Sequence, residues 1–266
     1  MPGRPRLSAI PWPGRLAAAR AALAAAAGAA LLFAAGHPGQ AHAASLQISP
    51  VSVRFAGEQQ ASSIALQNMG DAPIYGQVRV YRWDQKDGED VLTATREVIV
   101  SPPIVQIAAN ATQAIQLVLA PGARRTAEGS YRVLIDELGR EDGAAAQGFD
   151  IRLRYSVPVF LAPLPQPGAA PARDDALDWQ VFRKDGSWML KVRNDGAIHA
   201  QLGAVEFTNR AGAKFDISKG LFGYVLAGRE RQWKLQVDDK ADLAGAVNVR
   251  AVINARAPTN FVSRAQ

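Results

Sequence analysis

The stretch FDIRLRYSVPVF, residues 149–160, alternates in the way that is typical of one long β-strand. The odd-numbered positions are all apolar or aromatic: Phe149, Ile151, Leu153, Tyr155, Val157 and Val159. The first four even-numbered positions are all polar: Asp150, Arg152, Arg154 and Ser156. Such a period of two predicts a strand with one face on a core and the other face exposed. The two arginines on the polar row raise the question of what that exposed face binds.

The chain on either side of this stretch repeats the same pattern. About seven short strands, roughly a dozen residues apart and without an amphipathic helix between them, predict an all-β sandwich. Residues 163–174 are rich in Pro, Gly and Ala and indicate a linker. The strand pattern then resumes with a hairpin around Asp185-Gly186, which predicts a second, smaller β-sandwich. The expected domains are therefore residues 44–162 and 175–266.

The first 43 residues have the composition of a secretory signal peptide. Four arginines and no acid stand in residues 1–20, an apolar run follows to about Gly36, and Ala-His-Ala at 41–43 has the small residues of a cleavage site. The apolar run is shorter than the ~20 residues of a membrane span, which disfavours the alternative of an uncleaved anchor. The mature protein is expected to be soluble in the periplasm, without stable membrane insertion.

Charge and cysteine content narrow the classes of function. The chain carries 30 basic and 24 acidic residues, a net charge of +6, but four of its arginines belong to the predicted signal. The mature part then has 26 basic and 24 acidic residues, or +2, and a nucleic-acid partner is not expected. Because the sequence contains no cysteine, an exported protein of this kind must be held together by its cores alone.

Residues suited to catalysis or metal binding are scarce. The expected mature chain has one histidine, His199, which the pattern places on the surface of a strand, because His37 and His42 belong to the signal. One histidine and no cysteine exclude histidine-rich zinc sites and make a Ser-His-Asp or Cys-His enzyme remote. The sequence therefore predicts no enzyme, no metal site and no cofactor.

Acidic residues gather in three clusters whose surroundings are typical of turns and linkers. The first acidic cluster is Asp84, Asp87, Glu89 and Asp90, and the other two are Asp174, Asp175 and Asp178, and Asp238, Asp239 and Asp242. None of them has the ligand spacing of a calcium loop. We expect all three to be solvated turns.

Arginine recurs on the predicted strands of the first sandwich, as Arg54, Arg79, Arg82, Arg132, Arg152 and Arg154. Each of them alone is explained as well by solvation of a strand face as by binding. Together they indicate a surface suited to a carboxylate, because a guanidinium binds a carboxylate through two parallel hydrogen bonds.

The chain resembles the periplasmic pilus (fimbrial) assembly chaperones of the chaperone–usher pathway, particularly the archaic branch that serves spore-coat-type pili. The resemblance is carried by QVRVYRWDQKDGED (77–90), SPPIVQI (101–107), YRVLIDEL (131–138) and LRYSVPVFLAP (153–163). The order and spacing of these stretches are more specific than any one of them, and the resemblance covers essentially the whole mature chain. It implies two immunoglobulin-like β-sandwich domains set at an angle, with a cleft between them.

The resemblance also implies a function, which is donor-strand complementation. Such a chaperone binds, folds and caps pilus subunits by lending each of them a strand, and it delivers them to an outer-membrane usher. The donor row that this implies is Phe149, Ile151, Leu153 and Tyr155. Val157 and Val159, further along, are expected in the protein's own core. An exposed apolar edge is normally an aggregation hazard, but here it would be the part that binds.

Basic residues in the cleft of such chaperones anchor the C-terminal carboxylate of the subunit. The positions that many relatives use fall at Ser52 or Val53 and close to Pro158, and none of these residues is basic. The resemblance therefore leaves Arg154, Arg132 and Arg54 as candidates for the anchor.

The competing interpretation is a secreted two-domain adhesive or carbohydrate-binding β-sandwich protein. That class normally shows exposed aromatic residues on one sheet or a calcium site, whereas Trp83, Trp179, Trp188 and Trp233 are scattered and look like packing residues. The sequence leaves open which subunits are bound and which oligomer the free protein forms. It also leaves open whether Pro102 or Pro103 follows a cis bond.

Overall fold

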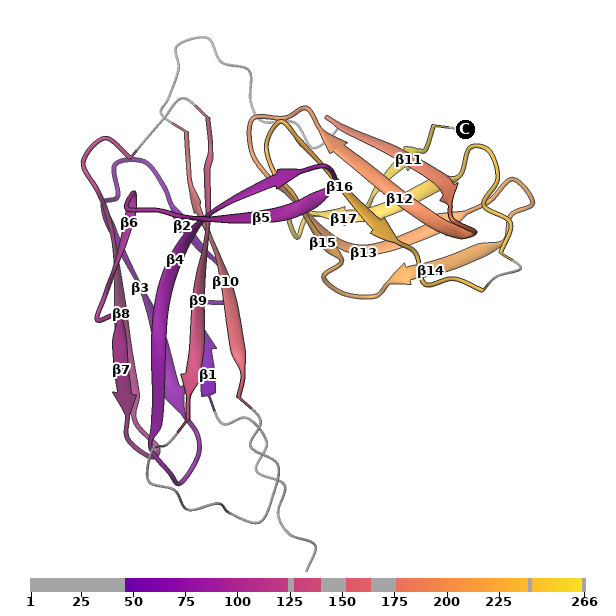
Figure 1. Cartoon of the computed structure of the whole chain (residues 1–266). Coiled ribbons are helices and arrows are strands. Elements are labelled where there is room, and N and C mark those ends of the chain that lie inside the picture. The colour runs from indigo at the N-terminus through magenta and orange to yellow at the C-terminus, as the bar shows by residue number, and fades with distance from the viewer. Residues whose placement is uncertain (1–45, 124–126, 140–151, 164–175, 239–240, 265–266) are drawn as a thin grey trace, which may run out of the picture. The chain divides into compact units, whose positions relative to one another are not determined.

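The computed structural model describes residues 46–123, 127–139, 152–163, 176–238 and 241–264. All of the regular elements in these residues are β-strands, numbered β1 to β18 along the chain (Figure 1). The predicted signal peptide and nearly all of the predicted linker lie outside the described residues. In the described part of the chain, no helix is long and apolar enough to cross a membrane.

Two sheets form the first β-sandwich. One has the order β1 (Leu46–Ser49), β3 (Ala61–Asn68), β8 (Thr112–Leu119) and β6 (Val98–Ser101). The other has the order β2 (Val53–Phe55), β10 (Arg154–Leu161), β9 (Gly129–Leu138), β4 (Ile74–Lys86) and β5 (Glu89–Ala94), and β7 (Ile104–Ile107) also pairs with β4. β10 and β2 are parallel, whereas the other pairs of this sandwich are antiparallel.

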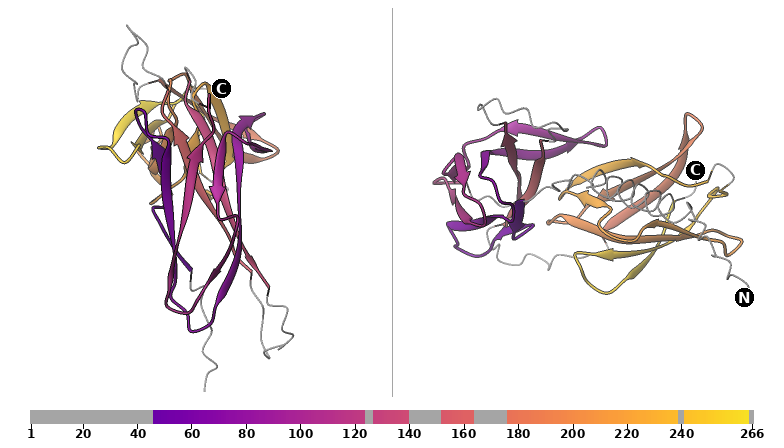
Figure 2. Two further views of the ribbon diagram at one scale, coloured as in Figure 1. Left: turned by 90° about the vertical axis from the view of Figure 1, so that its left-hand side faces the viewer. Right: turned by 90° about the horizontal axis from the view of Figure 1, so that it is seen from below.

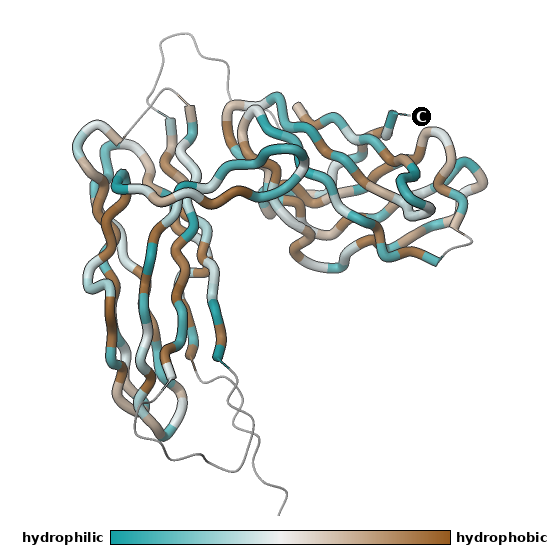
Figure 3. Tube along the Cα trace, viewed as in Figure 1, coloured by the Kyte–Doolittle hydropathy of each residue, from teal (hydrophilic) through white to brown (hydrophobic). Residues whose placement is uncertain are grey.

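The core of the first sandwich comes from alternate residues of the two sheets. Ile115 and Leu117 on β8 are fully buried, and so are Tyr131 and Val133 on β9. Figure 3 shows the same alternation as brown and teal along the strands. The period of two in the sequence is therefore also the period of burial.

A second β-sandwich follows, with its own core. One sheet has the order β11 (Leu177–Lys184), β12 (Ser187–Asn194) and β16 (Arg229–Lys234). The other has the order β14 (Lys214–Ser218), β13 (Ala200–Thr208), β17 (Asn248–Ile253) and β18 (Thr259–Val262), and β15 (Gly223–Val225) also pairs with β13. Trp179, Leu190, Leu202 and Phe207 lie at the centre of its core. Seen from below in Figure 2, the strands of each sandwich separate into two layers. The predicted all-β class is confirmed, and the residue boundaries of the domains stay a prediction.

Two hairpins turn through the dipeptide Asp-Gly. Asp185 and Gly186 join β11 to β12 with φ angles of 50° and 77°, which confirms the predicted hairpin. Asp87 and Gly88 join β4 to β5 in the same way, with φ angles of 54° and 79°. Positive φ at both central residues is the geometry that suits a tight hairpin turn. The turn expected over residues 84–90 is therefore confined to Asp87-Gly88, and the strands continue through the charged residues on both sides.

Two prolines follow cis peptide bonds, Pro50 and Pro102. The sequence left open which of Pro102 and Pro103 would be cis, and the cis bond is the one between Ser101 and Pro102. The carbonyl of Pro103 accepts a hydrogen bond from the Val78 N–H at 2.8 Å. This bond ties the crossover from β6 to β7 onto β4.

Candidate functional site

The outer edge of β10 is only partly covered by another strand. β10 pairs with β9 along its whole length, but on its other side only Val159–Leu161 pair with β2. Within the described ranges, no strand lies beside the section from Arg154 to Pro158 on that side. The sheet of the first sandwich is therefore open along the first half of β10.

The backbone groups at this open edge follow from the hydrogen-bond pattern. The Glu137 N–H donates to the Leu153 carbonyl at 3.0 Å, so the backbone polar groups of Leu153 face β9. Residues of an antiparallel strand alternate between bonding to that neighbour and pointing away from it. The N–H groups of Arg154 and Ser156 therefore point to the open side, and Pro158 ends the row because it has no N–H.

The odd-numbered side chains of β10 grade from partly exposed to buried. Val157 and Val159 are 3% and 0% exposed in the first core, as the sequence predicts. Tyr155 is half-buried against the same core, and Leu153 is half-buried at the strand's start. The Tyr155 hydroxyl donates a hydrogen bond to the Glu137 carboxylate. Burial and this nearby carboxylate raise the pKa of Tyr155 to about 12. Phe149 and Ile151 lie outside the described residues.

Arg154 is engaged by a carboxylate on the outer face of the same sheet. Asp136 lies directly opposite Arg154 on β9 and accepts a hydrogen bond from its Nε. Its other oxygen accepts one from Arg79 Nη2 at 2.6 Å. Burial raises the pKa of Asp136, but the bonds from the two arginines outweigh this and hold the pKa below its usual value.

A surface hollow of about 390 Å³ lies over this ion-pair group. It is lined by Gln77, Arg79, Asp136, Glu137, Arg152, Leu153 and Arg154. Three arginines and two acids make the lining charged, with an excess of one positive charge. The start of β10 therefore borders a charged surface on one face and the apolar core on the other.

Arg132 has different surroundings, because its guanidinium lies on aromatic rings. Its central carbon is 3.7 Å from the ring centroid of Trp83 and 5.4 Å from that of Tyr224. Burial lowers the pKa of Arg132, although Asp90 and Tyr224 oppose the shift. No carboxylate of the described residues lies within 4.0 Å of it. Arg132 is thus a partly desolvated cation held by ring faces, and among the described carboxylates only the more distant Asp90 acts on its charge.

Arg54, the third anchor candidate, is exposed on β2. In the strand register it lies opposite Phe160 of β10, beyond the open section of the edge. The three candidates therefore differ in kind: Arg154 is ion-paired, Arg132 is stacked on rings, and Arg54 is exposed to solvent.

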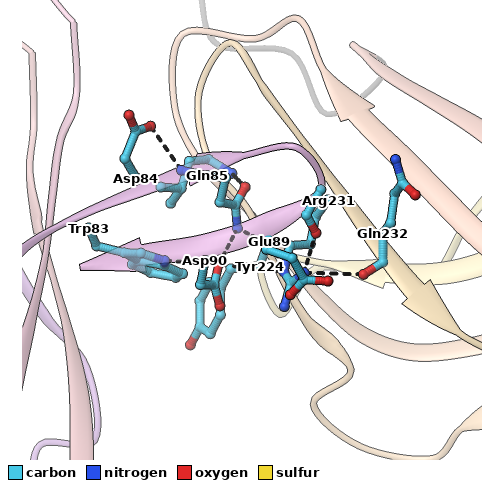
Figure 4. Close-up of polar contacts among 10 residues, drawn as sticks. Trp83, Asp84, Gln85, Glu89, Asp90, Tyr224, Arg231 and Gln232 are labelled. Atoms are coloured by element: carbon cyan, nitrogen blue, oxygen red, sulfur yellow. Dashed lines mark hydrogen bonds and ion pairs between the residues drawn. The ribbon is translucent and has the colours of Figure 1, made fainter.

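The β4–β5 hairpin contacts the second sandwich through buried polar groups (Figure 4). Gln85 is 3% exposed, and its Nε2 donates to Asp90 at 3.0 Å and to the Tyr224 carbonyl at 2.9 Å. Its Oε1 accepts from the Leu226 N–H at 2.9 Å. Gln85 therefore binds the backbone of β15 at Tyr224 and the backbone of Leu226 just after it, with both ends of its amide.

Three residues of the first acidic cluster belong to this contact, so the interpretation as a solvated turn was wrong for Asp84, Glu89 and Asp90. Asp87 is exposed in the hairpin turn, as expected. Asp84 pairs with Arg229 at 2.5 Å, and Glu89 pairs with Arg231 at 2.8 Å. Asp90 accepts the indole N–H of Trp83 at 3.0 Å. Arg229 and Arg231 lie about 140 residues away in the sequence, and Trp83 lies on the facing strand of the hairpin. Because none of these partners is a near neighbour in the sequence, the run of acids was interpreted as a solvated turn.

His199 is buried, so the prediction of a surface histidine was also wrong. It is 6% exposed, and its ring stacks on Phe160 with the centroids 3.5 Å apart and the planes 5° apart. Its Nδ1 lies 2.9 Å from the Glu128 carboxylate, which also accepts the His199 backbone N–H at 2.6 Å. Both partners come from the first sandwich, whereas His199 directly precedes β13.

The described residues show no aromatic binding platform and no metal centre. Trp83, Trp179 and Trp188 are 3%, 1% and 9% exposed, and Trp233 packs half-buried against Phe222. Among the described residues, no group of three or more His, Cys, Asp or Glu is arranged to hold a metal ion. The buried tryptophans disfavour the carbohydrate-binding alternative, which needs exposed rings.

Comparison with protein families gives a match over the first sandwich. Residues 45–165 match the model described as pili and flagellar-assembly chaperone, PapD N-terminal domain. No curated protein matches the chain.

Solved structures match over both sandwiches. One contains the chaperone CsuC with the tip adhesion subunit CsuE, from the archaic Csu pili of Acinetobacter baumannii, with a TM-score of 0.62, 22% identity and coverage of 83% of this chain and 99% of that one. The Escherichia coli chaperone DraB has a TM-score of 0.55 and 16% identity over 84% of this chain and 97% of its own. The SafA pilin–SafB chaperone complex of Salmonella enterica has a TM-score of 0.54 and 18% identity, with 83% and 96% covered. These likenesses show the fold, and they confirm the predicted two-sandwich architecture.

Proposed function

Residues 45–165 belong to the family of pili and flagellar-assembly chaperones, and on this premise we propose that the protein is a periplasmic chaperone that lends β10 to pilus subunits. It binds, folds and caps a subunit by strand addition and passes it to an outer-membrane usher. The family is one of chaperones and not of enzymes, in agreement with the sequence. The chaperones CsuC and SafB, which share the fold, were each solved in complex with a subunit of a pilus, and this supports a partner of the same class.

The open edge of β10 is the observation that carries the proposal. The N–H groups of Arg154 and Ser156 point away from β9, toward a side without a strand in the described chain. Strand addition uses such groups for main-chain hydrogen bonds and uses alternate side chains to fill pockets of the partner. The row that fills the subunit is then Phe149, Ile151, Leu153 and Tyr155, of which Leu153 and Tyr155 are the described members.

Arg132 is the strongest candidate for the carboxylate anchor. It lies directly opposite Pro158 in the register, which is the residue where the open edge ends. A subunit strand beside β10 cannot extend its ladder past Pro158, because that residue has no N–H and β2 begins to pair at Val159. The end of that strand would then lie near a partly buried cation that forms no close ion pair within the described residues, and a carboxylate would bind it.

Co-purification tests the anchor and the function together. The protein is co-expressed with a tagged pilus subunit of the same organism, and its recovery with the tag is measured. Arg132→Ala should reduce recovery strongly, because loss of a desolvated charge pair costs about 2–5 kcal/mol of binding. Arg183→Ala is the matched control, since Arg183 also stacks on a tryptophan, Trp188, but in the second sandwich. Wild-type protein that recovers no subunit would refute the function, and equal recovery with Arg132→Ala would refute the anchor.

A further inference from the structure

The start of β10 is held to β9 by contacts on both faces of the sheet. On the outer face, Asp136 accepts hydrogen bonds from Arg154 and Arg79. On the core face, the Tyr155 hydroxyl donates to Glu137 Oε1 at 3.1 Å. Between them, the Glu137 N–H bonds to the Leu153 carbonyl at 3.0 Å. Two adjacent acids of β9 thus hold Leu153 and the first two residues of β10, Arg154 and Tyr155.

These contacts lie where the strand is otherwise weakest. The open edge gives residues 154–158 a neighbour on one side only in the described chain. The terminal residues of a strand open more readily than its centre, and an edge strand is prone to register slip. A slip of one residue would exchange the apolar and charged rows of β10. Side-chain contacts at this point therefore fix which row faces a partner.

The exposure of these groups indicates a local role and not one in overall stability. The Arg154 side chain is 62% exposed and the Arg79 side chain is 39% exposed, although Asp136 itself is 15% exposed. Exposed ion pairs contribute little to the global stability of a fold. They can still raise the cost of opening one strand end, because that opening breaks few other contacts.

We propose that Asp136 and Glu137 are positioning residues that hold the first residues of β10 in register, so that its open edge is ordered before a subunit arrives. The inference rests on the proposed function. Asp136 and Glu137 would support strand addition indirectly, by holding Arg154 and Tyr155 in place. An ordered edge avoids the entropy cost of ordering a frayed strand on binding. It also gives Arg154 a role other than the carboxylate anchor.

Amide hydrogen exchange of the free protein tests the positioning role without a subunit. The measured amide is that of residue 155, whose N–H faces β9, because the N–H groups of Arg154 and Ser156 already point to the open edge. Its exchange is followed in the wild type, Asp136→Asn, Glu137→Gln and Tyr155→Phe. Each variant should exchange there about tenfold faster or more, whereas its melting temperature should fall only slightly, because the opening that becomes easier is mainly local. Asp136→Glu should restore slow exchange, since it restores the carboxylate. Asp195→Asn is the matched control, because Asp195 accepts from Arg193 Nη2 at 2.7 Å in the second sandwich.

Capture of a co-expressed, tagged pilus subunit gives the second readout. Asp136→Asn should recover about fivefold less subunit than the wild type, because the edge must first be ordered. If Arg154 were the anchor instead, Asp136→Asn would free its guanidinium and recovery would be equal or higher. Unchanged exchange in the variants, or unchanged capture by Asp136→Asn, would overturn the inference. Wild-type protein that captures no subunit would refute the proposed function, and the exchange result would still decide whether the two acids hold the strand.

Discussion

The imidazole of His199 lies flat on the phenyl ring of Phe160, with the two centroids 3.5 Å apart. Phe160 belongs to the even-numbered row of residues 149–160. This row is polar as far as Ser156, but its last two residues, Pro158 and Phe160, are apolar. Trp83 and Leu226 are buried in the same cluster. The even-numbered row of β10 therefore changes from an exposed charged face to a buried contact within eight residues.

Glu128 should be essential for this contact. Its carboxylate is 1% exposed and accepts hydrogen bonds from two groups of His199, the backbone N–H and the ring Nδ1. Glu128→Ala leaves two buried donors without an acceptor and should lower the free energy of unfolding by about 2–4 kcal/mol. Glu128→Gln, which keeps one acceptor oxygen, should cost less. Urea unfolding measures both, with the exposed Glu58→Ala as control, and an unfolding free energy for Glu128→Ala that equals the control's would contradict the assignment.

Gly88 and Gly186 form a matched pair that reports on the docking of the β4–β5 hairpin. Both are the second residue of an Asp-Gly turn, with φ angles of 79° and 77°. A Cβ on Gly88 would lie 2.8 Å from Gln232 of β16, whereas nothing lies within 4 Å of one on Gly186. Both alanine variants carry the cost of positive φ, about 1 kcal/mol, but Gly88→Ala should lower the melting temperature more. Equal melting temperatures would mean that the hairpin tip does not rest on β16 in solution.

The stability that Asp136 contributes to the fold should decrease at acidic pH. Its pKa in the folded protein is below the usual value of 3.8, so its stabilising contribution is complete above that pH. The contribution is lost as the pH falls through the lower, folded-state pKa. The difference in unfolding free energy between wild type and Asp136→Asn should therefore be constant near neutrality and shrink below about pH 4. A difference that stays the same down to pH 2.5 would contradict the pairing with Arg79 and Arg154.

Tyr155 should give the opposite dependence at alkaline pH. Burial and Glu137 raise its pKa from 10.0 to about 12, so its neutral form is favoured in the folded state. The stabilisation is complete below pH 10 and is lost as the pH rises toward 12. Tyr155→Phe cannot ionise, so the wild type should lose stability relative to this variant across that window. Chemical unfolding at several pH values measures it, and parallel curves would show that the hydroxyl is solvated.

The sequence predicted the elements well wherever local pattern decides them. Alternation placed Val157 and Val159 in the core, and the Asp185-Gly186 pair marked a real hairpin. Both features depend on neighbours within a few residues, because side-chain period and turn chemistry are local. The family resemblance, which rests on several such stretches in order, was confirmed for the same reason.

Contacts between distant segments could not be read in this way. Gln85 looked like part of a polar turn, because its partners Tyr224 and Leu226 lie some 140 residues away. His199 looked exposed, because its burial comes from Phe160 and Glu128 and not from its own strand. Charged and polar residues carry no alternation that distinguishes a solvated turn from a paired contact. Only the fold shows which acids meet which arginines.

The candidate site was predicted in part. The sequence named Arg132 and Arg154 from their residue type and strand position. Their different surroundings, ring faces for Arg132 and Asp136 for Arg154, became visible only with the strand register. Asp136 was missed because an acid next to Glu137 in a strand resembles ordinary solvation. A search for acids opposite arginines on neighbouring strands would have found it.

Hydrogen exchange of β10 with and without a bound pilus subunit tests the central claim most directly. The N–H groups of Arg154 and Ser156 point to the open edge, and in the complex they should bond to the added strand. Our account predicts strong protection of residues 153–157 on binding, together with little change in β18, which is an edge strand of the second sandwich. A complex that forms while the exchange of residues 153–157 stays as fast as in the free protein would contradict strand addition at β10.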